Sequence, residues 1–206
     1  MKGHDELVLA IRRSELFSDD AFQGVKCDGL ELLHERVRRH GFWIKRAEAE
    51  RDESVKQLIP YCVIRRAASV FLTKRLNAQT EARLHNLFSV GIGGHMNESG
   101  ATTLEDLIAD NLRRELAEEL VLDEPEAVEL IGAINDDSTS VSRCHFGLLY
   151  EVWTRGDVRV RETDKMIGGF VPLNDIGPGS DIYREMEDWS RHAVSVLWRR
   201  DGRRAD

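Results

Sequence analysis

The feature that most constrains this chain is the stretch from Gly100 to Leu122, in which acidic residues and aliphatic residues recur at helical spacing. An aliphatic residue stands at every fourth position, which gives a helix one apolar face to bury against a sheet. These residues are Leu104, Ile108, Leu112, Leu116 and Leu120. Because positions three and four apart share one side of a helix, Glu115, Glu118 and Glu119 are expected to form one patch.

Three carboxylates on one patch repel one another, and a hard divalent cation relieves that repulsion by taking their oxygens as ligands. The spacing therefore predicts a site for Mg²⁺ or Mn²⁺. The alternative is a solvated helix face, because Glu and Arg are good helix formers and such runs are common on surfaces.

An apolar segment that ends in two glycines precedes this helix and favours the metal site over the solvated face. It reads Ser-Val-Gly-Ile-Gly-Gly-His from Ser89 to His95. Glycine lets a backbone approach a metal or a phosphate closely, so Gly93 and Gly94 are predicted to bind substrate. His95 is predicted to hydrogen-bond a phosphate or to assist proton transfer, and its alternative role is to cap a loop carbonyl.

Together these residues resemble the motif of the Nudix hydrolase superfamily, of the MutT type. The motif spacing is met by Gly100, Asp106, Arg114, Glu115, Leu116, Glu118, Glu119 and Leu122. Two positions differ from it, since Asp106 replaces the first Glu and Val121 replaces the closing Gly. That Gly serves a turn in which a positive φ is wanted, so the exit from this helix is expected to have another shape.

The resemblance covers about residues 57–173 and extends beyond the motif. The sequence of residues 57–61 and 91–95 is similar to that of a bacterial branch of the superfamily described as phosphoesterases. The double glycine stands six residues ahead of Gly100, so 96–102 is interpreted as an insertion. The resemblance implies an α/β fold, a Nudix-type α/β/α sandwich with a mixed β-sheet, here with an N-terminal helical extension.

The same resemblance implies magnesium-dependent hydrolysis of a diphosphate linkage. The substrate would be a nucleoside diphosphate linked to another group, or a similar small phosphorylated metabolite. Glu118 and Glu119 are predicted to bind the metal, and Glu115 to bind it or to take a proton from the attacking water. Arg114 is predicted to hold these carboxylates by hydrogen bonds, since its planar fork suits two carboxylates.

Nudix enzymes usually place a further acidic residue on a loop outside this helix. Glu162 is the first candidate for it, Asp164 the second, and the pair Asp136 and Asp137 the third. Each has an ordinary turn as its alternative, because Asp and Glu are common and solvated at the ends of hairpins.

Basic residues beside the predicted strands are candidates for binding the substrate phosphates. Arg75 and Arg83 are the two selected, and the alternative for each is a solvated charge at a strand edge. The strands are expected at 61–65, 70–74, 88–92, 128–134, 145–153 and 170–173, with a closing helix at 181–198.

The chain of 206 residues has the length of one domain with an extension. We expect a helical extension at 1–56 and a Nudix hydrolase domain at 57–206. Within the extension, Leu30, Leu33, Val37 and Phe42 predict a helix that ends near Gly41 and covers an apolar surface of the domain. A detached arm that makes contacts in a homodimer is the alternative.

The net charge of −8 disfavours a nucleic-acid polymer as partner, because its phosphates would be repelled. Three scattered cysteines indicate a reducing compartment: Cys27, Cys62 and Cys144. No targeting or membrane-spanning segment is apparent, so a cytoplasmic protein that does not bind membranes is expected.

Two other functions remain open at this point. The fold could serve as a catalytically weak ligand-binding or regulatory domain, with Asp106 and Val121 as early losses. Isomerase chemistry on a prenyl diphosphate, which one branch of the fold performs, would need a cysteine and metal-binding histidines near the site. Cys62 and Cys144 are the cysteines near predicted strand positions.

Overall fold

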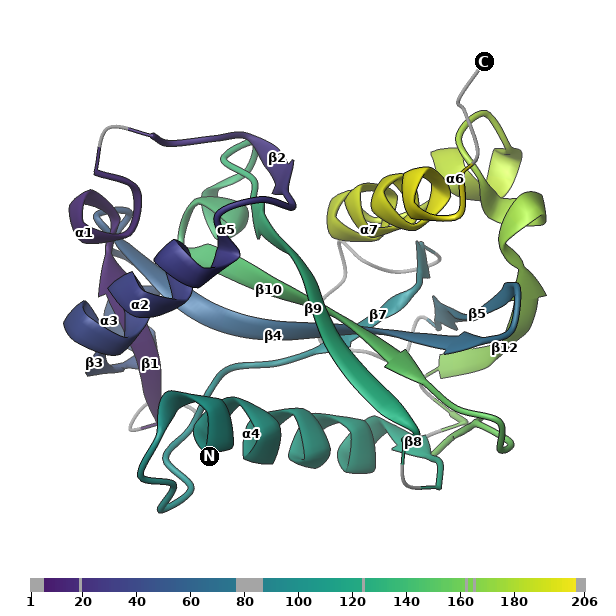
Figure 1. The fold of residues 1–206 in the computed structure, drawn as a ribbon, viewed down its shortest axis with the longest axis horizontal. Coiled ribbons are helices and arrows are strands. Elements are labelled where there is room, and N and C mark those ends of the chain that lie inside the picture. The colour runs from purple at the N-terminus through teal and green to yellow at the C-terminus, as the bar shows by residue number, and fades with distance from the viewer. Residues whose placement is uncertain are drawn as a thin grey trace. The chain divides into compact units, whose positions relative to one another are not determined.

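A computed structural model describes residues 6–18, 20–76, 87–123, 125–161, 163–164 and 166–202. The fold is α/β, with a mixed sheet and several helices (Figure 1). Two compact units share the chain. The first comprises the described residues within Met1–Tyr61, Gly93–Arg114 and Ile131–Leu149. The second comprises those within Cys62–Ile92, Glu115–Leu130 and Tyr150–Asp206.

Strand β1 (Leu7–Arg12) ties the N-terminal segment to the sheet of the first unit. It pairs antiparallel with β3 (Phe42–Lys45) and with the start of β4 (Val55–Arg66), where Ala10 faces Gln57. Its residues from Val8 to Ile11 are almost fully buried. The N-terminal segment is therefore joined to the rest of this unit by backbone hydrogen bonds.

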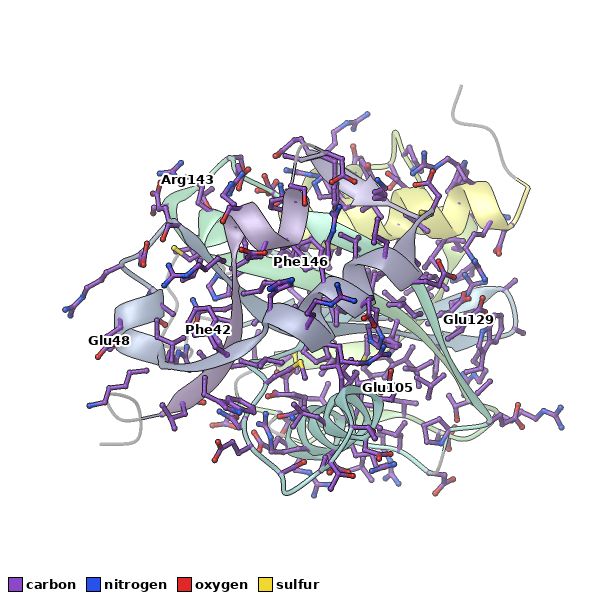
Figure 2. All side chains as sticks on the ribbon, turned by 60° about the vertical axis from the view of Figure 1, so that its left-hand side comes forward. Phe42, Glu48, Glu105, Glu129, Arg143 and Phe146 are labelled. Carbon is purple, nitrogen blue, oxygen red and sulfur yellow. The ribbon has the colours of Figure 1, made fainter. Side chains whose placement is uncertain are left out.

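In the order of the sheet, β4 is followed by β10, β9 and β2, and strands β4, β9 and β10 contribute residues to both units. Strand β2 (Gly24–Lys26) is antiparallel to β9 (Ala127–Asn135), and β10 spans His145–Trp153. An edge-to-face cluster of Phe17, Phe22 and Phe146, the last labelled in Figure 2, has ring centroids 5.8 to 6.2 Å apart.

Helix α2 (Leu30–His40) is the helix expected within the N-terminal segment. It buries Leu33 and Val37, and Gly41 follows it as predicted. The segment also contains two short helices, α1 (Arg13–Phe17) and α3 (Arg46–Ala49), besides strands β1, β2 and β3. The expectation of a helical extension is thus incomplete, because the apolar residues of β1 form a strand that pairs with its neighbours.

An ion pair between a buried lysine and a half-buried aspartate explains why β4 begins earlier than the expected residue 61. Lys56 is fully buried, and its Nζ donates to Asp137 Oδ1 at 2.8 Å. Arg13 donates to the same carboxylate from both terminal nitrogens. These partners compensate the burial of the ammonium group, so a charged residue lies inside a strand. Hydrogen bonds from Arg13 and then from Lys56 hold the pKa of Asp137 well below its usual value.

In the second unit, β5 (Ser69–Arg75) is the central strand of three antiparallel pairings. It pairs with β12 (Met166–Pro172), with β6 (Phe88–Ser89) and with the end of β4. Rings of Phe71 on β5 and Phe170 on β12 lie 5.4 Å apart across one of these pairs. A 3-10 helix, η2 (Leu173–Ile176), starts at the residue where the last strand was expected to end.

The expected closing helix is divided into α6 (Asp181–Arg184) and α7 (Asp188–Arg200). The backbone between them pairs with Phe88, whose N–H donates to Glu185 O and whose carbonyl accepts from Glu187 N. These bonds replace the helical ones and interrupt the helix. Val194 and Leu197 are fully buried on α7, as its apolar spacing predicts.

Helix α4 (Leu104–Glu119) carries the predicted carboxylates and contributes residues to both units. Strand β7 (Gly91–Gly93) precedes it, and α5 (Ser140–Arg143) precedes β10. Within the described ranges, no helix combines the length and apolar character needed to cross a bilayer.

Candidate active site on helix α4

The start of α4 assigns Asp106 a structural role. Thr103 Oγ1 accepts from the backbone N–H of Asp106 at 3.1 Å and donates to its Oδ2 at 2.8 Å. This is a capping arrangement, in which the residue before the helix and the third helical residue satisfy each other. An aspartate at this position is therefore explained by the helix start.

The predicted apolar face of α4 is buried over most of its length, and Leu104 at its start is half-buried. Ile108, Leu112 and Leu116, together with Leu120 just beyond the helix, are each at most 6% exposed. A helix held along this face has a fixed rotation, so the positions of its acidic residues are fixed as well.

The three glutamates differ in exposure. Glu115 is 9% exposed, Glu119 is half-buried and Glu118 is exposed. The carboxylate of Glu115 therefore lies inside the protein, whereas those of Glu118 and Glu119 lie toward its surface. Carboxylate oxygens are the donors that Mg²⁺ and Mn²⁺ prefer, so the donor type fits a hard divalent cation. In the described part of the chain, no three acidic, histidine or cysteine side chains stand close enough to hold a metal ion.

Arg114 connects α4 to the loop after the double glycine. Its Nη2 donates to the backbone carbonyl of His95 at 2.8 Å and to Asn111 Oδ1 at 2.9 Å. Both acceptors belong to the first unit. The guanidinium thus holds the loop, and its predicted role toward the carboxylates stays a prediction.

Asn111 was not singled out by the sequence. It is 2% exposed, and its side-chain amide makes four hydrogen bonds. Oδ1 accepts from Asn97 N and from Arg114, while Nδ2 donates to the carbonyls of Asn97 and Leu107, all at 2.9 Å. An asparagine inside a helical pattern looks like a surface residue, and no local signal marks a partner fourteen positions away.

His95 is hydrogen-bonded to a second histidine. Its Nε2 lies 3.2 Å from Nε2 of His145, whose Nδ1 lies 2.7 Å from the carbonyl of Val141. Because a carbonyl can only accept, His145 carries its proton on Nδ1 and accepts from His95 with Nε2. The binding of a phosphate by His95 stays a prediction, and in this arrangement its N–H is directed to His145.

Burial and nearby cations keep this histidine pair neutral. Burial is the largest cause that lowers the pKa of His95, to about 3, with Arg46, His145 and Arg114 adding to it. The pKa of His145 is lowered as well, mainly by burial. A neutral pair is compatible with the single hydrogen bond between the two Nε2 atoms.

Two glycines near the site have local structural reasons. A Cβ on Gly93 would lie 2.6 Å from the carbonyl oxygen of Pro60, so only glycine fits beside that strand. Gly100 adopts a φ of +82°, a left-handed conformation that favours glycine. The proposed contacts of Gly93 and Gly94 with a substrate remain predictions.

The end of α4 differs from the turn that a closing glycine would make. The helix continues directly into β8 (Leu120–Val121), which pairs antiparallel with β11 (Arg159–Val160), and a β-branched Val suits that extended backbone. Arg161 caps the helix, since Nε donates to Ala117 O at 2.9 Å and Nη2 to Leu120 O at 3.2 Å. A cation at a helix C-terminus is stabilised by the helix dipole.

The candidate loop acids and phosphate ligands are described only in part. Glu162 and Arg83 lie outside the described residues, and Arg75 is described only by its backbone in β5. Asp164 is exposed in a turn. Asp136 Oδ1 accepts from Ser138 N at 3.0 Å, a contact typical of an aspartate that shapes a turn.

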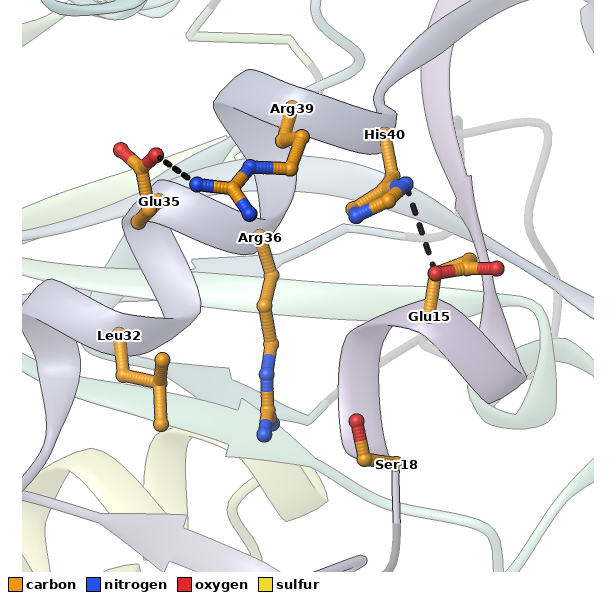
Figure 3. A pocket seen from close by; sticks show the side chains of 7 residues that line it. All are labelled: Glu15, Ser18, Leu32, Glu35, Arg36, Arg39 and His40. Atoms are coloured by element: carbon orange, nitrogen blue, oxygen red, sulfur yellow. Dashed lines mark hydrogen bonds and ion pairs between the residues drawn. The ribbon is translucent and has the colours of Figure 1, made fainter.

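Cys62 lies fully buried in β4, and burial, followed by the charge of Glu115, raises the pKa of its thiol. A protonated buried thiol is a poor nucleophile. A cavity of about 260 Å³ lies between α1 and α2 (Figure 3), with acids and bases paired on its walls: Glu15, Ser18, Leu32, Glu35, Arg36, Arg39 and His40. None of these lining residues is a predicted site residue.

Two relatives match nearly the whole chain. Protein YmaB of Bacillus subtilis (strain 168) is 35% identical over 202 residues, which cover 94% of this chain and 98% of that protein. The crystal structure of Tm1382, assigned to the Nudix hydrolases, is 31% identical, covers 94% of this chain and 99% of that one, and gives a TM-score of 0.82.

A more distant structure shares the fold. The Nudix domain of Shewanella oneidensis NrtR, solved in complex with ADP-ribose, is 16% identical over 71% of this chain and 88% of its own, with a TM-score of 0.50. No protein-family model matches the chain.

Proposed function

The chain belongs to the Nudix hydrolase superfamily, whose members act on phosphoric anhydrides, and we propose that it cleaves a diphosphate linkage with the help of Mg²⁺ or Mn²⁺. The substrate we propose is a nucleoside diphosphate linked to another group, or a similar small phosphorylated metabolite. ADP-ribose is a suitable first test compound, because the Nudix domain of NrtR was solved with it.

The observation that supports this proposal most directly is the set of three glutamates on α4, which differ in their exposure. Glu115 is 9% exposed on a helix whose buried apolar face fixes its rotation, and Glu118 and Glu119 follow within one turn. We propose that these three carboxylates bind the metal, which requires their side chains to move closer together than they stand in the structure. A bound divalent cation would neutralise phosphate oxygens and lower the cost of deprotonating a water molecule.

The protein's own groups would divide the remaining work. Glu115, the most buried of the three, either binds the metal or takes a proton from the attacking water. Arg114 keeps the loop of His95 on the same helix through its hydrogen bond to the His95 carbonyl. Holding reacting groups in one geometry accounts for a large share of such rate enhancements.

A ligand-binding domain without catalysis is the second candidate. The replacements at Asp106 and Val121 are its arguments, and the bond between Asp106 and Thr103 and the pairing of Val121 in β8 offer structural reasons for them instead. The intact set of glutamates favours catalysis. Isomerase chemistry is disfavoured by the buried, protonated Cys62.

A hydrolysis panel tests the proposal. ADP-ribose, nucleotide sugars, dinucleoside polyphosphates, coenzyme A and nucleoside triphosphates are incubated with Mn²⁺ or Mg²⁺, and the phosphorylated products are separated and quantified. Glu118→Gln should abolish most turnover. Glu105→Gln is the matched control. Glu105, which is labelled in Figure 2, is exposed on the same helix and pairs with Arg38. Binding of a panel compound without any product would favour the ligand-binding domain instead.

A further inference from the structure

The side-chain amide of Asn111 pairs with the backbone of Asn97 as one strand pairs with another. Oδ1 accepts from Asn97 N and Nδ2 donates to Asn97 O, both at 2.9 Å. Two further bonds, from Arg114 and to Leu107 O, use the remaining acceptor and donor. All hydrogen-bonding capacity of this buried amide is therefore used, which defines one orientation of the group.

The paired loop is held from its other side by the N-terminal strand. Asn97 Nδ2 donates to Leu7 O at 2.9 Å and to Glu6 Oε1 at 3.0 Å. Leu9 N donates to the carbonyl of Met96 at 2.9 Å, and Met96 is fully buried. The loop after the double glycine is thus fixed between β1 and α4 within the first unit.

Helix geometry relates this amide to the carboxylates. Asn111, Glu115 and Glu118 stand at intervals of four and three residues, so they lie along one side of α4. Arg114, which shares Asn111 Oδ1 with the loop, immediately precedes Glu115. A shift of the loop along the helix would break the amide pair and the bond from Arg114 to His95 together.

We propose that Asn111 is a positioning residue for the hydrolysis proposed above: it fixes the loop of His95 to Asn97 on the helix that carries the carboxylates. The inference rests on the proposed function for its effect on turnover. Its effect on the loop does not depend on that function. Misplacement of a reacting group by about 1 Å can lower a rate about 100-fold, so loss of this amide is expected to lower turnover strongly.

The test uses the full chain with two substitutions of Asn111. Asn111→Leu removes all four hydrogen bonds and keeps the branching of the side chain, although its methyl groups are larger than the amide atoms. Asn111→Asp keeps the oxygen that accepts from Asn97 N and Arg114, and it loses both donors. It remains informative if the leucine variant does not fold.

Two variants serve as controls. Asp110→Asn changes the neighbouring residue, whose bonds reach Ser99 and Arg113 instead of the loop backbone at Asn97. Gly177→Ala perturbs packing elsewhere, because a Cβ there would meet the ring of Trp198. All variants are assayed equally far below their unfolding midpoints, which separates positioning from general loss of stability.

Amide hydrogen exchange of Asn97 is measured without metal, and kcat/KM is measured with Mn²⁺ on the panel compound that the parent cleaves fastest. We expect Asn111→Leu to speed exchange at Asn97 and to lower kcat/KM, each at least 10-fold. For Asn111→Asp, both the exchange rate at Asn97 and kcat/KM should lie between the values of Asn111→Leu and of the parent. Both controls should match the parent in these two quantities. Unchanged exchange in both Asn111 variants, or an equal loss of kcat/KM in Gly177→Ala, would overturn the inference. If the parent cleaves nothing, the proposed function fails, and exchange alone decides whether Asn111 fixes the loop.

Discussion

Arg114 donates a hydrogen bond of 2.8 Å to the backbone carbonyl of His95, nineteen residues earlier in the chain. The bond joins the loop that follows the double glycine to the helix that carries the three glutamates. Within the first unit, a side chain that the resemblance assigns to the carboxylates therefore holds the loop, and its role toward the carboxylates stays a prediction.

Removal of the N-terminal segment should unfold the protein or make it insoluble. A truncation that starts at Gln57 would expose the edge of β4 and delete Val8, Ala10 and Ile11, which are fully buried. An unpaired strand edge invites aggregation. Circular dichroism and size-exclusion chromatography of the truncated protein, beside one that starts at Glu6, check this. A soluble, monomeric Gln57 variant with the parent's turnover and Michaelis constant would contradict it.

Stability should fall in acid partly through Asp137. Its folded pKa is lowered, so its stabilising effect is complete above the unfolded value of about 4 and is lost as the pH falls through the folded pKa. Asp137→Asn should therefore be less stable than the parent at pH 7, and the difference should shrink below about pH 4. Urea unfolding at several pH values measures this. A difference in the free energy of unfolding that stays constant from pH 7 to pH 2 would contradict a contribution from the protonation of Asp137.

Gly177→Ala should destabilise the protein by about 1–3 kcal/mol, because overpacking forces neighbouring side chains to move. A Cβ at Gly177 would lie 2.1 Å from an atom of the Trp198 ring. Gly169→Ala is the matched control, since a Cβ there meets no atom within 4 Å. The midpoints of denaturant unfolding should differ clearly between the two variants. Equal midpoints would show that the ring of Trp198 moves aside at little cost.

Turnover should rise with pH from 7 to about 9 when metal is saturating, because the attacking water has to lose a proton before it reacts. The measurement is kcat on the best panel compound at constant ionic strength. A rate that stays flat across this range would show that proton removal does not limit the reaction.

Much of the fold could be predicted because its signals are local. The apolar spacing of α4 and the apolar, aromatic-rich run of β10 are readable in short windows, and β10 spans the predicted residues. Strand β1 was missed although it is apolar, because the charged residues around it favoured a helix. Lys56 likewise hid the start of β4, since the partner that permits its burial, Asp137, lies 81 residues away.

The site divides in the same way. The glutamates and Arg114 could be predicted as one group because a helix brings nearby residues together, and their roles stay predictions. The amide pair of Asn111 with Asn97 and the histidine pair of His95 with His145 depend on tertiary contacts across fourteen and fifty positions. Neither residue type carries a local mark of such a partner.

The affinity of the protein for Mn²⁺, measured by titration calorimetry, tests the central claim most directly. Glu118→Gln keeps the shape of the side chain and removes one charge from the patch, whereas Glu105→Gln makes the same change at an exposed residue paired with Arg38. The metal assignment predicts that Glu118→Gln weakens Mn²⁺ binding at least about 10-fold, since a ligand's charge sets much of the affinity for a hard cation. It also predicts that Glu105→Gln binds like the parent. Equal Mn²⁺ affinity in the parent and in Glu118→Gln would contradict it.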